Sequence, residues 1–383
     1  MPWRYVLEIA HGTAEAGHKV VVVSDGPTSD RAFPLSLPEI IQVAGPFTAG
    51  NANFRSCRDG FKPDVVFFPV ARRTVLSGKL VKVGGAAHFA YFPSSWYHKK
   101  TLLNICRKLP AVDAVYYGLE SAMPGRWLTN LLGKSNIHGV LTISDYTARM
   151  IVKSGWSQSK LKVLPPGVEA QVPSRQPSPV FKDWSQRLSG KKYLLFMGPP
   201  KAIRGIHVLL KAFDMAAAQM EDVALVCLIR GGAEDELEAM ERTLNSLQQK
   251  GRVLVIKDSL NKADISAFIA ACHAVVLPFL LVPSEIPLTV LEVLAMGKPV
   301  LISETGGTSE YVGDAGMVFP AGDAKALETA LIKSCKDGAV YSRMCIAAKN
   351  KGKRQSTWQE VSEEFLKFVV PIVSNFQKSS HIR

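Results

Sequence analysis

Short runs of β-branched and other apolar residues recur along this chain, and segments with a helical period separate each run from the next. This alternation is typical of parallel sheets whose two faces are covered by helices. The sequence therefore predicts an α/β fold built from doubly wound, Rossmann-like sheets. The predicted strands are residues 19–25, 64–70, 140–144, 161–167, 192–198, 223–232, 252–258, 274–279 and 299–303.

The alternation stops in one stretch, residues 169–192, which holds prolines, serines and charges without an apolar rhythm. Such a stretch is typical of a linker. Because the ligand loops of a doubly wound sheet follow the carboxyl ends of its strands, we expect a cleft between two domains to hold the site. The predicted units are an N-terminal domain (1–168), a linker (169–191), a C-terminal domain (192–355) and a last helix (356–383) that crosses back to the N-terminal domain.

The chain opens with a predicted amphipathic helix, which places Val6, Leu7 and Ala10 on one face, and a strand follows after Gly17. A doubly wound domain normally begins with a strand and a glycine-rich turn before such a helix. We therefore expect the first strand of the N-terminal domain to be missing from this sequence. A truncated reading frame or an alternative start codon explains that more simply than a complete fold without the strand.

Composition narrows the class of protein. The 383 residues are 47% apolar, which is ample for two or three cores, and the longest apolar run, residues 274–282, is far shorter than the ~20 residues of a membrane span. The N-terminus lacks the continuous apolar core of a signal peptide. The six cysteines form no CxxC pair, so reduced thiols in the cytoplasm are the prediction.

The charge balance has two interpretations. With 46 basic and 33 acidic residues the net charge is +13, which favours anionic partners such as phosphates or membrane headgroups, and equally a well-solvated surface. The basic residues do not alternate with aromatic ones, so no specific nucleic-acid binding is predicted. Peripheral contact with the inner face of a membrane is compatible with this charge.

One strand-to-helix loop, GPPKAIRG at 198–205, has the chemistry of an anion site. Gly198 allows the backbone to approach a ligand, and the following helix start offers free amides and a favourable dipole. Lys201 and Arg204 add two cations, and a guanidinium can hold phosphate oxygens through two parallel hydrogen bonds. The loop therefore predicts a diphosphate cradle, with an ordinary surface arginine as the alternative.

Residues 286–296 are apolar at almost every position, which predicts a helix buried on all sides, and Glu292 lies in its middle. Taking a carboxylate into such a place costs several kcal/mol unless a polar partner meets it. The partner is either a ligand or the cation of a buried salt bridge.

Together, GPPKAIRGIHVLLKAF and the later PSEIPLTVLEVLAMGKPVLISETGGTSEYVGDAGMVFP resemble the donor-binding half of the retaining GT-B glycosyltransferases, in particular glycosyltransferase family 4 (glycosyl transferases group 1). AEAGHKVVVVSD, KPDVVFF, LTISDYTARMIVKSGWSQSKLKVLPPGVE and TWQEVSEEFLKFV resemble further family elements in the family's order. The resemblance covers most of the chain and is more specific in the C-terminal half. It implies two Rossmann-like domains that face each other across a cleft.

The resemblance assigns roles to residues of the second motif. Glu292 would hold the ribose hydroxyls of a nucleotide, and Glu285 would face the transferred sugar. The amides that follow, from Leu288, and the Thr289 hydroxyl would meet the β-phosphate.

The motifs also depart from the family pattern. Pro199 and Arg204 stand where the family commonly has arginine and lysine, and Glu285 and Glu292 are seven rather than eight positions apart. Pro287 removes one amide that could have bound phosphate.

In the N-terminal half the resemblance implies a histidine beside the transferred sugar, and His88, after a Gly-Gly-Ala-Ala strand, is the candidate. His98, Tyr91 and plain core packing are the alternatives. Ser144, at a predicted helix start, is either a ligand contact or an N-cap.

The resemblance implies a cytoplasmic hexosyltransferase of glycan biosynthesis, which moves a sugar from a nucleotide-diphosphate donor to a hydroxyl of a glycan or a lipid-linked sugar, with retention. No metal or other cofactor is required by the sequence, which has no Asp-x-Asp motif. A GT-B nucleotide-sugar 2-epimerase and an inactive nucleotide-sugar-binding subunit are the alternatives.

Overall fold

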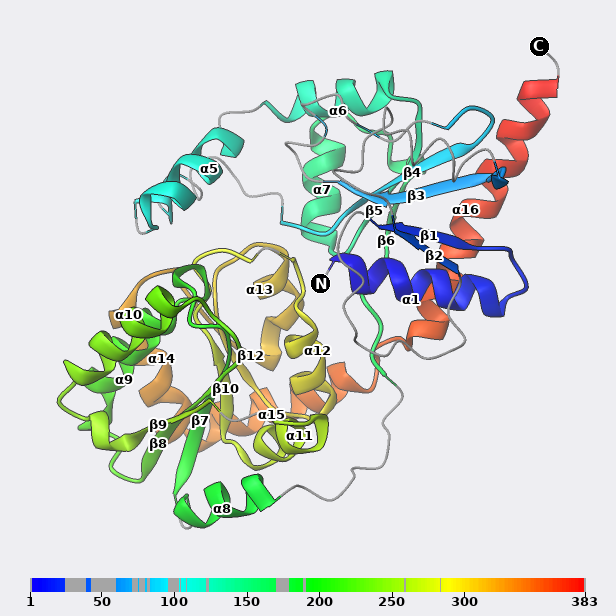
Figure 1. The fold of residues 1–383 in the computed structure, drawn as a ribbon. Helices are drawn as coiled ribbons and strands as arrows, with labels where there is room; N and C mark the ends of the chain where they lie inside the picture. The colour runs from blue at the N-terminus through cyan, green and yellow to red at the C-terminus, as the bar shows by residue number, and fades with distance from the viewer. Residues whose placement is uncertain are drawn as a thin grey trace.

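The structure is a computed structural model with two α/β domains, and the last helix returns from the second domain to the first (Figure 1). The described residues are 2–24, 39–42, 60–70, 75, 80, 83–95, 103, 105–107, 109–121, 124–169, 179–188, 191–257, 260–282 and 284–381.

The C-terminal domain is built on a six-stranded parallel sheet with the order β12-β11-β10-β7-β8-β9. Its strands are β7 (Lys192–Gly198), β8 (Val223–Ile229), β9 (Val253–Ile256), β10 (Ala274–Leu277), β11 (Val300–Ser303) and β12 (Gly316–Phe319). Its helices are α9 (Ile206–Ala217), α10 (Glu234–Asn245), α11 (Lys262–Ala271), α12 (Leu288–Ala295), α13 (Gly307–Val312), α14 (Ala324–Lys336) and α15 (Gly338–Gly352).

The N-terminal domain carries two separate parallel sheets, β1-β2 and β3-β4-β5-β6. Its strands are β1 (Val21–Ser24), β2 (Glu39–Gln42), β3 (Val65–Pro69), β4 (Ala87–Phe92), β5 (Ile137–Thr142) and β6 (Leu161–Val163). Its helices are α1 (Pro2–Glu15), α5 (Ala111–Ser121), α6 (Gly125–Lys134) and α7 (Asp145–Lys153). The sequence predicts a missing strand beside β1, and no strand among the described residues joins β1 to β3.

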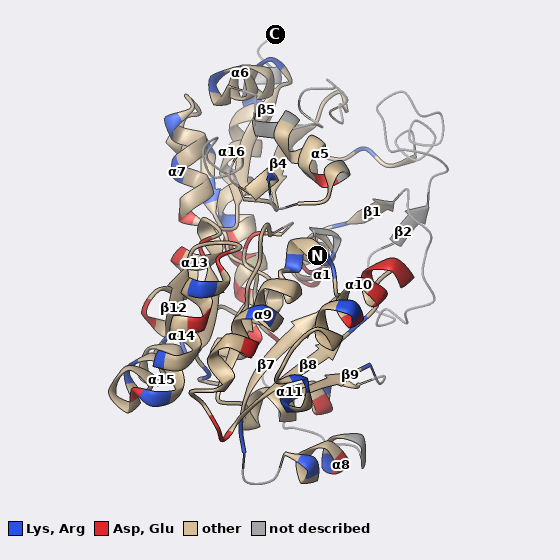
Figure 2. Cartoon of the chain, turned by 90° about the vertical axis from the view of Figure 1, so that its left-hand side faces the viewer, with Lys and Arg blue, Asp and Glu red and all other residues tan. Residues whose placement is uncertain are grey.

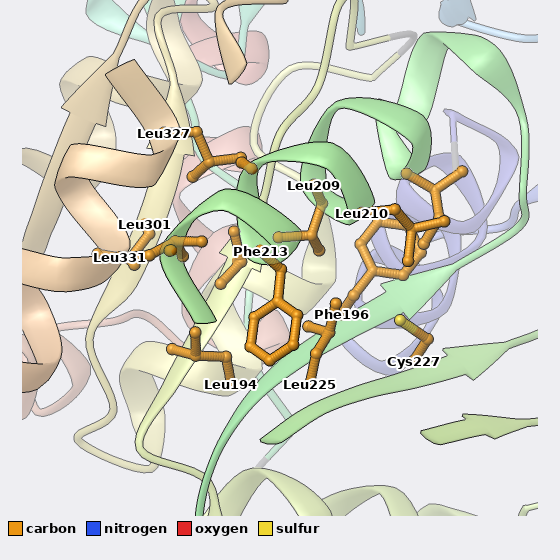
Figure 3. Close-up of a cluster of buried hydrophobic side chains, with 14 of the residues drawn as sticks. Leu194, Phe196, Leu209, Leu210, Phe213, Leu225, Cys227, Leu301, Leu327 and Leu331 are labelled. Atoms are coloured by element: carbon orange, nitrogen blue, oxygen red, sulfur yellow. The ribbon is translucent and has the colours of Figure 1, made fainter. Parts of the chain in front are cut away.

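The core of the C-terminal domain shows why the apolar runs form central strands. Side chains alternate between the two faces of a strand, so Leu194 and Phe196 of β7 point to one side and Leu195 to the other. Phe213 of α9 packs on the first side (Figure 3). Since helices cover both faces of the sheet, every position of β8 and the first four positions after Lys192 in β7 are buried.

The last helix, α16 (Trp358–His381), packs beside α1 on the N-terminal domain (Figure 1). Val361, Phe365 and Val369 share a buried cluster with Tyr5 and Ile9 of α1. The spacing of the three α16 residues, four apart, puts them on one face of the helix. The two chain ends are thereby packed into a single layer that covers the sheet of the first domain.

The predicted linker is wrong in one respect, because it contains a helix, α8 (Pro179–Arg187). Phe181 and Trp184, together with Leu188, pack against the C-terminal domain, where Phe181 meets the edge of Phe268 with ring centres 4.9 Å apart. These positions, three and four residues apart, form one helical face. Only three apolar residues carry this pattern, and the prolines and serines before them obscured it.

Candidate functional site

The sheet of the C-terminal domain reverses its strand order between β7 and β10. Loops that leave two such strands at their carboxyl ends diverge, and the crevice between them is where doubly wound sheets bind ligands. β7 ends at Gly198 and β10 at Leu277. Leu280 and Leu281, just beyond β10, pack with Ile105 of the N-terminal domain, so this end of the sheet faces the other domain.

The loop after β7 depends on two glycines. Gly198 has φ +148°, and only Phe196 Cζ, at 4.0 Å, lies near the place where a Cβ would be. Gly205 has φ +73°, and a Cβ there would lie 1.8 Å from the Pro278 carbonyl oxygen. Both positions therefore require glycine. The second one holds the start of α9 tightly against the carboxyl end of β10.

Arg204 ends the short 3₁₀ helix Ala202–Arg204, immediately before Gly205 and α9, as the diphosphate loop predicts. Its guanidinium carbon lies 5.1 Å from the centre of the Phe279 ring. Burial lowers the pKa of the half-buried guanidinium, and Tyr117 of the N-terminal domain acts in the opposite direction. No carboxylate of the described residues pairs with it. Arg204 is therefore a partly desolvated, stacked cation that an anionic ligand can neutralise.

Lys201, the second predicted cation, lies in the same loop but is exposed. Its Nζ is 3.9 Å from Oε1 of Glu236, near the start of α10. The other oxygen of Glu236 accepts a hydrogen bond of 3.0 Å from the Ala233 amide. Lys201 therefore shares its charge with a neighbouring acid, and Arg204 is the stronger candidate for a phosphate contact.

The prediction that α12 is buried on all sides is wrong. Val290, Leu291, Val293 and Leu294 are buried, whereas Glu292 is exposed. In a helix of 3.6 residues per turn these four positions lie on one side of the helix, and Glu292 lies on the opposite side. Glu292 therefore does not require a buried partner, and its carboxylate is open to a ligand.

The surroundings of Glu292 are charged. Glu169, near the end of the N-terminal domain, accepts hydrogen bonds from Arg4 Nη2 at 2.6 Å and Lys262 Nζ at 2.8 Å. Partial desolvation by the surrounding protein is the main reason that the pKa of Glu292 is raised. The charges of Arg4 and Lys262 lower this pKa, and the charge of Glu169 raises it further. Because Glu169 takes both nearby cations, no ion pair or hydrogen bond to the Glu292 carboxylate occurs among the described residues.

Glu285 is fully buried where the two domains meet. Its Oε1 accepts hydrogen bonds from Ser95 Oγ at 2.6 Å and Gly307 N at 3.0 Å, and its Oε2 accepts one from Ser144 Oγ at 2.5 Å. Its own amide donates to the Pro93 carbonyl at 2.7 Å. Ser95 and Ser144 follow β4 and β5 of the N-terminal domain, so this carboxylate links the two domains. We call Ser95, Ser144, Glu285 and Gly307 the domain clamp.

The domain clamp has two further features. A Cβ on Gly307 would lie 2.2 Å from Glu285 Oε1, so only glycine allows the carboxylate to dock there. Beside it, Arg149 Nη1 and Nη2 donate to the two carboxylate oxygens of Glu310 at 3.0 and 2.5 Å, which adds an exposed fork-to-fork pair between the domains. Ser144 also caps α7 by accepting from the Thr147 amide at 3.1 Å, so it is both a cap and a contact to Glu285.

The backbone after Glu285 is strained. Ile286 has φ +52°, a left-handed conformation that costs a β-branched residue roughly 1–2 kcal/mol. Pro287 follows as the N-cap of α12, so the half-buried Leu288 and Thr289 form its first turn. Leu288 also borders a gap of about 10 Å³ beside Tyr91, which is about the size of one water molecule.

The structure does not bring His88 to this site. The predicted Gly-Gly-Ala-Ala strand is wrong, because residues 84–85 form a turn and β4 begins at Ala87. His88 is thus at the amino end of β4, buried, and its Nε2 accepts from the Val83 amide at 2.9 Å. It lies five steps of ~3.3 Å along the chain from Pro93, whose carbonyl accepts from the Glu285 amide.

Of the alternatives to His88, Tyr91 is buried and stacks on Tyr5 with ring centres 4.4 Å apart, and His98 lies outside the described residues. The sequence reasoning did not identify Ser95, Arg4 or Phe279. Their positions have no local signature; the Gly-Gly pair at 306–307, shortly after the strand predicted at 299–303, was the one signal that could have located part of the clamp.

The domain clamp predicts a pH effect on stability. Burial raises the pKa of Glu285 above its ordinary value of 4.5, and hydrogen bonds from Ser144 and Ser95 only partly oppose this. Between the unfolded and the folded pKa of Glu285, the folded state keeps a proton that the unfolded state has lost. The contribution of Glu285 to the free energy of unfolding is therefore complete below the unfolded pKa and is lost as the pH rises through the folded pKa. Glutamine does not titrate. We expect denaturant melts to show wild type losing stability relative to Glu285→Gln as the pH rises.

The same pair of melts contains the contrary outcome. A wild type that gains stability over Glu285→Gln with rising pH would mean that the three donors hold the carboxylate charged. Glu238→Gln, an exposed change on α10, serves as the control and is expected to follow wild type at each pH.

Two features are absent from the described residues. No group of three or more His, Cys, Asp or Glu residues is placed to hold a metal ion. Of the helices in the part of the chain that the structure describes, none combines the length and hydrophobicity that a membrane span requires.

Curated relatives match mainly one half of the chain. The O-antigen chain mannosyltransferase C of Escherichia coli is 27% identical over 180 residues, which cover 45% of this chain and 44% of the relative. The D-rhamnosyltransferase WbpZ of Pseudomonas aeruginosa is 26% identical over 179 residues, with the same coverage. The matched stretch is thus under half the length of either relative.

Solved structures match the whole chain in fold. A glycosyltransferase from Rickettsia africae superposes with a TM-score of 0.72 at 15% identity and covers 97% of this chain and 95% of its own. Anabaena Alr3699/HepE, solved in complex with UDP and glucose, has a TM-score of 0.69 at 14% identity and covers 96% and 95%. At these identities the likeness shows the fold, which is GT-B.

Two family models match successive parts of the chain. The model described as Glycosyltransferase Family 4 matches residues 3–172, and the model described as Glycosyl transferases group 1 matches residues 191–337. The first covers the N-terminal domain. The second covers the sheet of the C-terminal domain together with the loop of Arg204 and the helix of Glu292. With both halves matched in order and the two Rossmann-like domains in place, the chain belongs to the GT-B glycosyltransferases of family 4.

Proposed function

We propose that this protein is a retaining glycosyltransferase that moves a sugar from a nucleotide-diphosphate-sugar to a hydroxyl acceptor. Family membership supports glycosyl transfer, and the relatives named as a mannosyltransferase and a rhamnosyltransferase are hexosyl and deoxyhexosyl examples. The Anabaena neighbour, which binds UDP and glucose, supports a nucleotide sugar as donor. Retention is inferred from the resemblance of the two motifs to retaining enzymes.

The observation that carries the proposal is the position of Arg204. It is a half-buried cation without a carboxylate partner among the described residues, and it lies at the strand reversal between β7 and β10. Glycosyl transfer from such a donor leaves negative charge on a diphosphate. A preorganised guanidinium in a partly dry site stabilises that charge in the transition state more than in the ground state, which accelerates the reaction.

The two glutamates would act on different parts of the donor. The exposed, unpaired carboxylate of Glu292 would accept hydrogen bonds from two ribose hydroxyls, with Leu288 and Thr289 near the β-phosphate. Glu285 would face the sugar only after the domain clamp opens, because three protein donors now occupy its oxygens. We therefore propose that donor binding exchanges the contacts from Ser95 and Ser144 for contacts to the sugar.

The acceptor is proposed to be a glycan or a lipid-linked sugar. Lys and Arg are distributed over both domains (Figure 2), and the net charge of +13 suits an acceptor at an anionic membrane surface. The peripheral contact and the cytoplasmic location remain proposals. The cations of the diphosphate loop would supply the positive charge that the leaving group needs, so we propose that turnover requires no metal ion.

Product analysis tests the proposal. A thermal-shift screen against nucleotide sugars would identify the donor, and the purified chain would then be incubated with that donor and candidate glycan acceptors, with and without EDTA. Nuclear magnetic resonance of the product is expected to show the donor's anomeric configuration in the new glycosidic bond. Inversion would contradict the retaining mechanism. Formation of a 2-epimerised nucleotide sugar in the absence of acceptor would indicate a nucleotide-sugar 2-epimerase instead of a glycosyltransferase. Donor binding without any product would indicate an inactive subunit.

A further inference from the structure

A basic concavity lies at the opposite end of the C-terminal sheet from Arg204. It has a volume of about 430 Å³ and is lined by Lys191, Lys192, Ala271, Cys272, His273, Lys298 and Tyr341. We call it the lysine hollow. Apart from Tyr341 of α15, its lining residues stand at or just before the amino ends of β7, β10 and β11. Since β7 is seven residues long and rises ~3.3 Å per residue, about 20 Å separates the hollow from Gly198.

The charges of the lysine hollow have no acidic counterpart. None of the residues that line it is an Asp or a Glu. Lys191, Lys192 and Lys298 form no ion pair with any carboxylate in the described part of the chain. Three ammonium groups around one hollow repel each other, and a multivalent anion placed between them removes that repulsion.

One side of the hollow is held in place by hydrogen bonds and stacking. Lys298 Nζ donates to the Cys272 carbonyl at 2.9 Å, which orients the ammonium and leaves two of its three N–H donors for a ligand. The His273 ring stacks on Tyr341 with centres 3.9 Å apart, and its Nε2 donates to the Ser334 carbonyl at 2.9 Å. The Tyr341 hydroxyl in turn donates to the His273 carbonyl at 3.1 Å. Because these protein groups are already ordered, they lose less conformational entropy when a ligand binds.

The environment of His273 shows that the lysines act on the interior of the hollow. Burial is the first cause of its lowered pKa, and the charges of Lys192 and Lys298 lower it further, while the bond to Ser334 acts in the opposite direction. The positive potential of the lysines therefore extends to the stacked rings of His273 and Tyr341.

We propose that the lysine hollow is a second binding site, separate from the donor cleft, for a small molecule that carries a phosphate or diphosphate group. Ammonium groups bind phosphate as compact point charges. The volume of about 430 Å³ falls within the range of small-molecule sites and exceeds the size of a single phosphate, so a phosphorylated metabolite or a phospholipid headgroup fits. The proposal does not depend on the donor chemistry at Arg204.

Calorimetric titration with inorganic pyrophosphate tests this, because the donor cleft and the hollow would both bind it. Wild type is expected to bind pyrophosphate at two sites. Arg204→Ala should keep the site in the hollow. The double variant Lys192→Gln/Lys298→Gln should lose about tenfold or more in affinity, and only at the hollow. Lys211→Gln/Lys250→Gln removes the same two charges from exposed positions outside the hollow and should match wild type. Lys191→Gln/Lys192→Gln, which leaves the Lys298 bond to Cys272 intact, provides a second hollow variant should the first fold poorly.

The outcomes separate the two sites. Unchanged stoichiometry and affinity in both hollow variants would overturn the lysine hollow, as would an equal loss in the Lys211/Lys250 control. Loss of binding in the hollow variants alone, with no effect of Arg204→Ala, would support the hollow and count against the donor cleft. Sedimentation with phosphatidic acid vesicles and with phosphatidylcholine vesicles then identifies the source: a lysine-dependent preference for the former indicates a headgroup, and its absence indicates a soluble ligand.

Discussion

Arg204→Ala is expected to lower turnover about 100- to 1000-fold, the scale on which one preorganised charge-stabilising donor acts. The guanidinium stacks on Phe279 at the strand reversal and has no carboxylate partner among the described residues, so its charge is available to a leaving diphosphate. The loss should fall mainly on kcat, because negative charge grows on the leaving group in the transition state. Steady-state kinetics with the identified donor measures it.

Two further variants locate the effect. Arg204→Lys keeps the charge but loses the planar fork, so an intermediate activity is expected. Arg242→Ala, an exposed arginine on α10 paired with Glu238 at 3.3 Å, should behave as wild type. Near-normal turnover in Arg204→Ala would contradict the assignment; a large loss in Lys201→Ala at the same time would move the role to Lys201.

Glu292→Gln is expected to weaken nucleotide-sugar binding by roughly 1.5–3 kcal/mol, or about tenfold to a hundredfold, because two charge-assisted hydrogen bonds to ribose hydroxyls become weaker ones. The carboxylate is exposed on α12 and forms no ion pair among the described residues. Calorimetry of donor binding to both proteins measures the change.

Stability distinguishes this role from a structural one. Partial desolvation raises the pKa of Glu292, so the charged side chain is mildly unfavourable in the free protein at neutral pH. Glu292→Gln should therefore leave the free energy of unfolding unchanged or raise it slightly in a denaturant melt. Glu238→Gln controls for the lost charge. A variant that loses several kcal/mol of stability while binding the donor normally would remove Glu292 from the site, because that is the behaviour of a broken salt bridge.

The fold class and the position of a basic loop just before α9 were predictable because both rest on local patterns. Apolar runs of strand length that alternate with helical periods indicate parallel sheets in any context. Lys201 and Arg204 both lie in the eight-residue loop at 198–205, so their order along the chain already places two cations at a helix start. The structure confirms the two Rossmann-like domains built on parallel sheets that this pattern predicts.

The exposure of Glu292 was not predictable from its neighbours. An apolar helix is buried only where other elements cover it, and α12 packs against β11 and α15 while its remaining side stays open. The sequence shows which residues could be buried, whereas the arrangement of the layers decides which direction remains uncovered. His88 illustrates the same limit, since a shift of the strand start by a few residues moves a side chain to the other end of the sheet.

What the sequence determined by itself is therefore the alternation of strands with helices and the charge of the loop at 198–205, since these depend on residues close together in the chain. Only the tertiary structure decided the partners of Glu285, because Ser95 and Ser144 are 190 and 141 residues away along the chain. It also decided the lysine hollow, whose lysines come from the starts of β7 and β11, the two strands that flank β10 in the sheet. Contacts between distant segments follow from how sheets and helices pack, and that packing is set by the whole set of buried surfaces rather than by any single motif.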